Sequence, residues 1–183
     1  MTIAKELKAL QEAIVSCTLC PLSESRTNTV PGEGSPNARL FFVGEAPGAK
    51  EDETGKPFVG RSGKLLTTLI GEIGLSREDV FISSILKCRP PNNRLPKRSE
   101  RETCRPYIEK QIELINPRVI VLLGGTAISS MVGPWKVTEA HGTFFEAQGR
   151  TYFMTFHPAA ALRSTGVKEL MRADFKILQS ELL

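Results

Sequence analysis

Four cysteines are the residues whose type and spacing point most directly to chemistry in this chain of 183 residues. Two form the motif Cys17-x-x-Cys20 near the start, and Cys88 and Cys104 follow in the middle. Four thiolates can enclose a structural zinc ion or a [4Fe–4S] cluster, and Cys-x-x-Cys places two of them within reach of one centre. The spacing therefore predicts a metal site and leaves zinc and iron–sulfur both open.

Two disulfides are the plainer alternative for four cysteines, but the rest of the sequence disfavours them. Residues 1–16 are predicted to form a charged amphipathic helix rather than a signal peptide, so nothing marks the chain as secreted. No apolar run approaches the roughly 20 residues that span a bilayer. With 40% hydrophobic residues, the chain is expected to form one soluble domain over 1–183, as a cytoplasmic monomer without a membrane partner.

Charge is concentrated in one segment of the chain. Between Lys87 and Arg105 there are seven basic residues and two acidic ones, in a protein whose net charge is +4. A polyanionic partner such as nucleic acid explains this imbalance, and an ordinary solvated helix face is the alternative.

The elements that must position these residues alternate between strands and helices. Short apolar runs at 39–44, 79–86, 118–124 and 150–156 are typical of buried parallel strands, and helical patterns occupy 63–73, 98–115, 125–132 and 167–182. Pro106 is expected to start or kink the long helix. This order predicts an α/β fold: a three-layer α/β/α sandwich around a four-stranded, mainly parallel sheet with right-handed crossovers.

Polar and glycine-rich loops follow each of the predicted strands. They contain residues 44–48 (GEAPG), 87–93 (KCRPPNN), 124–126 (GGT) and 157–158 (HP). In a parallel sheet the carboxyl ends of the strands share one edge, where ligands bind. Turn formation explains any one of these loops, but four on one edge indicate a binding site.

Three segments carry a resemblance to a known family. Residues 44–66 (GEAPGAKEDETGKPFVGRSGKLL), 86–94 (LKCRPPNNR) and 157–164 (HPAAALRS), together with the four cysteines, resemble the family 4 (iron–sulfur) uracil-DNA glycosylases from Cys17 to the last helix. The resemblance implies a monofunctional DNA repair enzyme that hydrolyses the N-glycosidic bond of a deaminated base, most often uracil. It also implies a structural [4Fe–4S] cluster on Cys17, Cys20, Cys88 and Cys104.

A glycosylase must hold a flipped base and stabilise the negative charge that the leaving base develops. Phe58 is the expected stacking platform, although core packing is its ordinary role. His157 is expected to donate a hydrogen bond to the leaving base. Glu45 and the backbone of Ala46 are expected beside the sugar and base. Ala46 stands where other glycosylase families carry an Asp that positions water. Water activation is therefore expected from Glu45, from backbone groups, or hardly at all, in which case electrostatic preorganisation does most of the catalysis.

A second group of residues is expected to contact DNA. Leu162 is a candidate wedge that fills the gap left by the flipped base, with packing in a short helix as the alternative. Arg163 is a candidate phosphate contact on the same loop. Arg61, Lys87 and Arg89 are expected to line the phosphate track.

Ser84 departs from the family pattern, in which an Asn is expected at the end of the second strand. An amide both donates and accepts, which distinguishes uracil from cytosine, whereas a hydroxyl carries a single donor. The sequence therefore leaves three outcomes open: slower excision of uracil, recognition of the base through a water molecule, or a shifted specificity for hypoxanthine or xanthine.

Two readings from other protein classes use the same cysteines and basic segment. They are a non-catalytic iron–sulfur protein that binds DNA or senses redox state, and a zinc-stabilised nucleic-acid module. Neither would need Phe58 and His157 at converging strand ends. A related subgroup that bonds covalently to DNA uses a histidine in the loop after the second strand, and the segment between Cys88 and Cys104 contains none, so turnover is expected.

Overall fold

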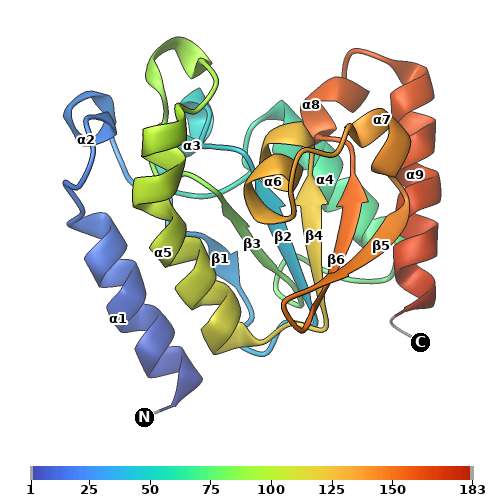
Figure 1. Ribbon diagram of the computed structural model, residues 1–183, viewed down its shortest axis with the longest axis horizontal. Coiled ribbons are helices and arrows are strands. Elements are labelled where there is room, and N and C mark those ends of the chain that lie inside the picture. Colours follow the sequence, from blue (N-terminus) through green and yellow to red (C-terminus); the bar gives the residue numbers. More distant parts are fainter. Residues whose placement is uncertain (1, 182–183) are drawn as a thin grey trace.

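The computed structural model describes residues 2–181 as a mixed sheet with helices on both faces (Figure 1). Within these residues the sheet has six strands in the order β1-β3-β2-β4-β6-β5. Their bounds are β1 Glu33–Gly34, β2 Leu40–Gly44, β3 Phe81–Ser84, β4 Val119–Leu123, β5 Thr143–Ala147 and β6 Arg150–Thr155.

The centre of the sheet is parallel, as predicted. Strand β2 pairs with β3 and β4, and β4 pairs with β6, all in parallel. These four are the strands expected from the sequence. Two antiparallel edge strands that the sequence did not predict extend the sheet: β1 along β3 and β5 along β6. The β5–β6 hairpin turns through Gln148 and Gly149, both at positive φ (52° and 71°), which is the backbone geometry that favours tight hairpins.

Helices cover both faces and complete the predicted three layers. The helices are α1 Ile3–Val15, α2 Leu22–Ser25, α3 Ala49–Thr54, α4 Arg61–Glu72, α5 Arg98–Ile115, α6 Gly125–Met131, α7 Val137–Ala140, α8 Pro158–Ala161 and α9 Thr165–Ser180, with a 3-10 turn over Pro91–Asn93. Helix α5 starts at Arg98 and runs through Pro106, so the proline does not begin it. The predicted last helix is confirmed to Ser180, and position 182 lies outside the described residues.

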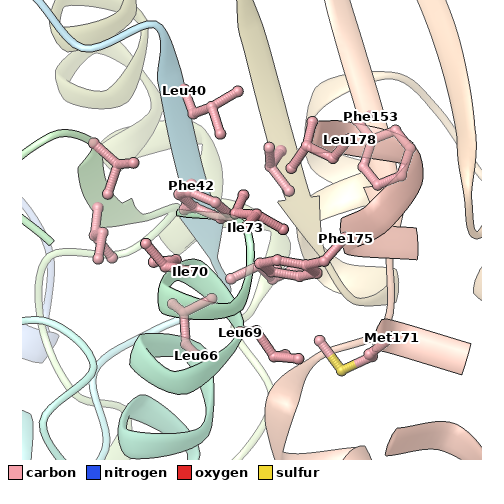
Figure 2. Packing of buried hydrophobic residues seen from close by; sticks show 14 of the residues in the cluster. Leu40, Phe42, Leu66, Leu69, Ile70, Ile73, Phe153, Met171, Phe175 and Leu178 are labelled. Atoms are coloured by element: carbon pink, nitrogen blue, oxygen red, sulfur yellow. The ribbon is translucent and has the colours of Figure 1, made fainter. Parts of the chain in front are cut away.

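The two faces of the sheet bury separate apolar clusters, because successive residues of each strand point to opposite faces. On one face, Phe42 of β2 stacks on Phe175 of α9 with ring centroids 5.9 Å apart, between Leu69 of α4 and Phe153 of β6 (Figure 2). On the other face, Phe41 and its neighbours pack against α5 and α6. Every residue of β2, β3 and β4 is buried, which fixes the carboxyl ends of these strands rigidly.

Within residues 2–181, no helix is long and apolar enough to cross a membrane.

Candidate functional site

A pocket of about 250 Å³ opens at the carboxyl ends of the parallel strands. It is lined by the five residues that the sequence assigned to base binding and catalysis: Glu45, Ala46, Phe58, Ser84 and His157. They come from segments far apart in the chain, and the parallel sheet brings them to one edge. The pocket also contains Glu51, Asn93 and Arg94, to which the sequence analysis gave no role.

A second, more open depression adjoins this pocket. Glu45, Ala46 and His157 line both, and Thr126 and Arg163 line the second one only. Arg163 is exposed just after α8, and Leu162, at the end of α8, is 41% exposed. The structure therefore does not bury Leu162 in a core, and it places the predicted wedge directly before Arg163, which lines the second depression.

Phe58 forms one wall of the pocket in an unusual backbone conformation. Its φ is +49°, in the left-handed region that a bulky side chain rarely adopts. The ring lies directly over Gly44, where a Cβ atom would stand 2.5 Å from its Cζ. Its centroid is 5.7 Å from that of His157. The side chain is also 7% exposed and packs against the core, so its core-packing and pocket-lining roles coexist.

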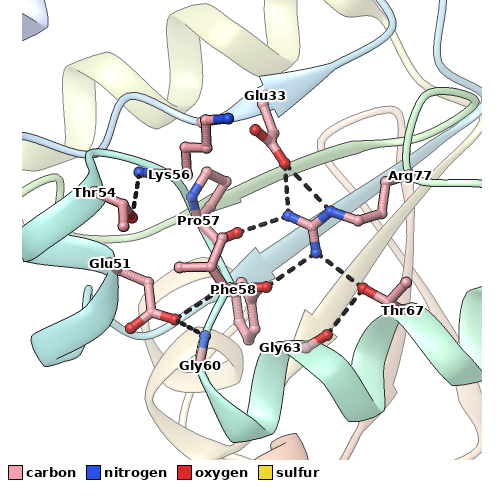
Figure 3. A network of polar contacts seen from close by, with 12 residues as sticks. Glu33, Glu51, Thr54, Lys56, Pro57, Phe58, Gly60, Gly63, Thr67 and Arg77 are labelled. Carbon is pink, nitrogen blue, oxygen red and sulfur yellow. Dashed lines mark hydrogen bonds and ion pairs between the residues drawn. The ribbon is translucent and has the colours of Figure 1, made fainter.

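The backbone of Phe58 is held from both sides by hydrogen bonds (Figure 3). On one side, Glu51 Oε1 accepts from the amides of Val59 (2.9 Å) and Gly60 (2.8 Å). Strained backbone persists only where its surroundings over-determine it, and such strain clusters at functional sites. Glu51 therefore acts on the position of Phe58, a role that the sequence did not reveal because residues 49–54 lack a clear helical pattern.

On the other side, one guanidinium clamps the segment. Arg77 donates through Nη2 to the carbonyl of Pro57 (2.6 Å) and through Nη1 to that of Phe58 (3.0 Å). The same guanidinium forms an ion pair with Glu33, with Nη2 and Oε1 2.7 Å apart. Gly63 allows helix α4 to approach the Phe58 backbone closely, since a Cβ atom at position 63 would lie 1.9 Å from the Phe58 carbonyl oxygen.

His157 is held as a neutral imidazole. It caps the short helix α8, and its Nδ1 accepts a hydrogen bond from the Ala159 amide at 3.1 Å. An accepting Nδ1 is unprotonated, so the ring proton is on Nε2. Burial lowers the pKa of His157 to about 4, an effect that the negative charge of Glu51 partly opposes. At neutral pH the side chain is thus an uncharged donor in the pocket wall.

Glu45 joins the loops after two neighbouring strands. The Thr126 hydroxyl, at the start of α6, donates to Glu45 Oε2, and the Glu45 carbonyl accepts from the Leu86 amide at 3.1 Å. The carboxylate therefore has a fixed orientation between the two depressions. Ser84 ends β3 and is 5% exposed, with its Oγ beside Gly44 beneath the Phe58 ring.

Lys87 is a predicted DNA contact that the structure contradicts. Its side chain is 1% exposed, and Nζ donates to Ser83 Oγ (2.5 Å), the Ser84 carbonyl (2.9 Å) and Gln111 Oε1 (2.7 Å). Burial lowers the pKa of Lys87 to about 7. A buried side chain whose ammonium group is bound by three partners at the end of β3 cannot reach a phosphate at the surface, so this prediction was wrong. Lys87 instead supports the backbone of Ser84.

The other two predicted track residues remain near the surface. Arg61 is exposed at the first position of α4. Arg89 donates through Nε to Asn93 Oδ1 at 2.7 Å, which places it on the loop that borders the pocket.

The four cysteines line one small pocket, together with Leu86 and Lys87 of the segment that follows β3. None forms a disulfide. Among residues 2–181, no group of three or more His, Cys, Asp or Glu side chains is arranged so that it could hold a metal ion. The structure therefore brings the predicted ligands together but does not itself display a metal site.

The donors around the sulfurs suit thiolates. Arg26 Nη1 lies 3.2 Å from Cys88 Sγ, and the Lys87 amide lies 3.4 Å from Cys104 Sγ. Burial raises the pKa of both thiols, that of Cys104 to about 11. Thiols in such an environment ionise when they bind a metal centre, and hydrogen bonds to sulfur are a normal feature of iron–sulfur sites.

A mostly parallel α/β/α sandwich with a polar pocket at its carboxyl edge defines a broad class of enzymes, and comparison with known proteins narrows it. The family model for the uracil DNA glycosylase superfamily matches residues 31–179, so the chain belongs to that superfamily. The type-4 uracil-DNA glycosylase of Sulfurisphaera tokodaii is 44% identical over 93% of this chain and 82% of its own length. That of Thermotoga maritima is 48% identical, over 86% and 84%. A type-5 uracil-DNA glycosylase of Pyrobaculum aerophilum is 30% identical, over 84% and 82%. The family expected from the three sequence segments is confirmed.

Proposed function

We propose that this protein is a uracil-DNA glycosylase that initiates base excision repair by releasing uracil and leaving an abasic site. The observation that carries the proposal is the convergence of Phe58, neutral His157 and Glu45 on one pocket in a chain that is similar to type-4 uracil-DNA glycosylases. The type-4 relatives do not favour the alternatives of a purine-specific glycosylase or a non-catalytic DNA-binding protein.

The chemistry follows from the state of each group. A flipped uracil stacks on Phe58, and the C1′–N1 bond breaks with both electrons passing to the base. The Nε2–H of His157 donates to O2 of the leaving uracil, where negative charge develops; one such preorganised donor is worth about 10²–10³-fold in rate. A water molecule positioned by Glu45 adds to C1′ and gives its proton to the Glu45 carboxylate, which passes it on to the released uracil anion, so the charges balance. Because His157 is neutral, it stabilises the anion without having to transfer a proton.

Ser84 sets the base preference in this proposal. Its hydroxyl offers one donor where an amide would offer a donor and an acceptor. We expect Ser84→Asn to raise uracil excision by about 5–150-fold, because one contact in a buried polar site is worth about 1–3 kcal/mol. An unchanged or lower rate would mean that other groups read the base.

The direct test is excision from labelled oligonucleotides that carry uracil, hypoxanthine or xanthine, followed by alkaline cleavage of abasic sites. Uracil should be released fastest. Release of a purine with little uracil would show that the pocket is retuned. Release of no base with DNA binding intact would overturn the enzymatic proposal.

The proposal includes a [4Fe–4S] cluster held by Cys17, Cys20, Cys88 and Cys104, as the family resemblance implies. The cluster would supply structure rather than catalysis, joining the start of the chain to the loops that follow β3. The protein is expected to be brown with broad absorption at about 400 nm, whereas a zinc protein would be colourless.

DNA is the proposed partner. Leu162 would fill the gap left by the flipped base, with Arg61, Arg89 and Arg163 on the phosphate track. We further propose that residues 1–183 act as one domain and as a cytoplasmic monomer on the chromosome, without covalent attachment to DNA.

A further inference from the structure

A second polar pocket of about 130 Å³ lies between α5 and α6. It is separate from the base pocket and shares no residue with it. Helix α5 contributes three arginines on one side, since positions separated by three, four and seven residues lie along one helix face. Helix α6 contributes two hydroxyls from its last turn. These five residues are Arg98, Arg101, Arg105, Ser129 and Ser130.

The charges around this pocket do not cancel. Arg98 pairs with Glu102 across 2.7 Å, and Arg105 pairs with Glu109 across 2.6 Å. Within residues 2–181, Arg101 has no carboxylate within ion-pair distance. Arg101 therefore contributes an uncompensated positive charge to the pocket lining, which favours an anion.

The hydrogen bonding of Arg101 points the same way. Its Nη1 donates to Ser130 Oγ at 3.1 Å. Its Nε is buried and has no hydrogen-bond partner, the one such side-chain nitrogen or oxygen in the described chain. A buried donor left unpaired is costly, and a guanidinium presents its donors in a fork that matches a tetrahedral oxyanion.

Helix α6 connects this pocket to the active site. Thr126, in its first turn, contacts Glu45 and lines the depression beside His157. Ser130 lies one turn further along, and its Oγ donates to the Thr126 carbonyl at 2.7 Å. Four residues of helix span about 6 Å, whereas nucleotides of one DNA strand advance about 3.4 Å each. A phosphate in this pocket would thus belong to a nucleotide within a few positions of the flipped base.

We propose that Arg101, with Arg98, Arg105 and Ser129, forms a site for a backbone phosphate of the DNA substrate, flanking the target nucleotide. The proposal rests on the function proposed above. It gives a role to the part of the basic segment, on α5, that the base pocket does not use. The shared ligand chemistry is a phosphate oxyanion, and its source is distinguished below.

Two variants test the site through binding rather than chemistry. Arg101→Gln removes the unpaired guanidinium, and Ser129→Asp places a negative charge at the exposed edge of the pocket. Both should raise KM for uracil-containing DNA about 5–10-fold at 0.1 M salt, with kcat unchanged. Arg101→Gln should also lower the slope of log KM against log salt by about 1, the value for one lost phosphate contact.

Matched controls separate this site from general charge effects. Arg172→Gln removes an exposed arginine of α9 that pairs with Glu72, and Thr68→Asp adds a charge at an exposed helical hydroxyl of α4. Neither should change KM or the salt slope by more than about twofold. If both pairs of variants raise KM equally, the effect comes from net charge and the proposed site is overturned.

A scan of neutral methylphosphonate substitutions identifies the phosphate. Wild-type protein should bind more weakly when one flanking phosphate is neutral, and Arg101→Gln should be insensitive at that same position. If the variant loses affinity at every position that the wild type does, the proposal fails. This outcome is distinct from failure of the proposed function, because binding to the scanned DNA is measured by fluorescence anisotropy whether or not uracil is released.

Orthophosphate distinguishes the other source of the ligand. If millimolar orthophosphate raises the Tm of the wild type but not of Arg101→Gln, and the DNA scan shows no position that depends on Arg101, the pocket binds a free anion. The assignment to the DNA backbone is then wrong. The assignment is supported if the scan finds a phosphate whose contribution depends on Arg101 and orthophosphate competes only weakly with DNA for binding.

Discussion

The base pocket and the cysteine pocket are lined by neighbouring residues of one segment, Ser84 in the first and Leu86 to Cys88 in the second, and they are held together in different ways. In the base pocket, the functional groups are fixed by hydrogen bonds within the chain: Glu51 and Arg77 hold the backbone around Phe58, and the Ala159 amide orients His157. This site is preorganised by the polypeptide alone, which is the condition for electrostatic stabilisation of a developing charge.

The cysteine pocket is built from apolar side chains and half-buried sulfurs. Its lining includes Ile14, Leu19, Leu22 and Leu86, and few polar contacts reach the sulfurs. Burial raises the pKa of Cys88 and of Cys104, so it disfavours the thiolate form of these two side chains. A bound group that takes up all four sulfurs would complete the site. Under the proposed function, this difference separates a pocket that performs chemistry from one that maintains structure.

Lys87 connects the two regions. Its Nζ donates to the Ser84 carbonyl at the end of β3, and its amide donates to Cys104 Sγ. One residue therefore contacts both the base-pocket strand and a cysteine of the other pocket.

Removal of His157 should give the largest effect on activity and leave the cysteine pocket intact. His157→Ala deletes the donor that faces the leaving base, so excision should fall about 10²–10³-fold. Single-turnover release of uracil measures the chemical step. The iron content of His157→Ala and its absorbance at about 400 nm should match those of the wild type. A loss below about tenfold would mean that another group stabilises the leaving base.

Removal of one cysteine should produce the opposite pattern. Cys88 is the most buried of the four at 7% exposure, and its substitution by Ala should release iron and lower the Tm by on the order of 10 °C, because metal binding contributes to folding. The rate per folded molecule should change only a few-fold. Ser23→Ala, in the same pocket, is the control that should retain iron. Full iron content in Cys88→Ala would contradict the assigned ligand set.

Glu51 tests whether the base pocket depends on its supports. Glu51→Ala leaves the Val59 and Gly60 amides without their acceptor, so Phe58 should shift and excision should fall about tenfold. Glu51→Gln keeps an accepting oxygen and should restore most of the rate. Glu53→Ala, on the same helix but with its carboxylate at the surface, should behave as the wild type. If Gln is as impaired as Ala, the charge of Glu51 itself takes part in the reaction.

Periodicity and strand burial allowed the sequence to predict the centre of this fold. The parallel strands are continuous apolar runs, and the long helices carry regular apolar faces, so their residues identify them. The edge strands were missed for physical reasons. Strand β1 has two residues, and β5 is only partly buried, so neither produces a clear pattern.

Motif residues of the site were predictable, and their supports were not. His157, Phe58 and the cysteines occur in distinctive segments, whereas Arg77 reaches the Phe58 carbonyl across 19 positions of the chain and carries no local signal. Lys87 was assigned a functional role, contact with DNA, that its position in the fold excludes. A lysine in a basic segment is normally exposed, and only the fold reveals that Ser83, Ser84 and Gln111 surround its ammonium group.

The smallest expected effect is the dependence of stability and activity on the protonation of His157. The pKa of folded His157 is about 4, below the ordinary value of 6.5, because the ring is buried. The unfolded chain therefore binds more protons between these values, and the stability contributed by neutral His157 is present above pH 6.5 and is lost as the pH falls toward 4. Activity should accordingly show no acid limb near pH 6.5, since the imidazole stays neutral there.

His157→Asn separates this titration from the rest of the protein. Asn is a strong N-cap and can accept from the Ala159 amide, but it does not titrate. Between pH 7 and pH 4.5 the Tm of the wild type should decrease more than the Tm of this variant. Any acid sensitivity of the cysteine pocket affects both proteins equally and does not contribute to the difference. Equal losses would mean that His157 is already solvated in the folded state, and the pocket would then lack the dry wall on which the proposed stabilisation of the leaving base depends.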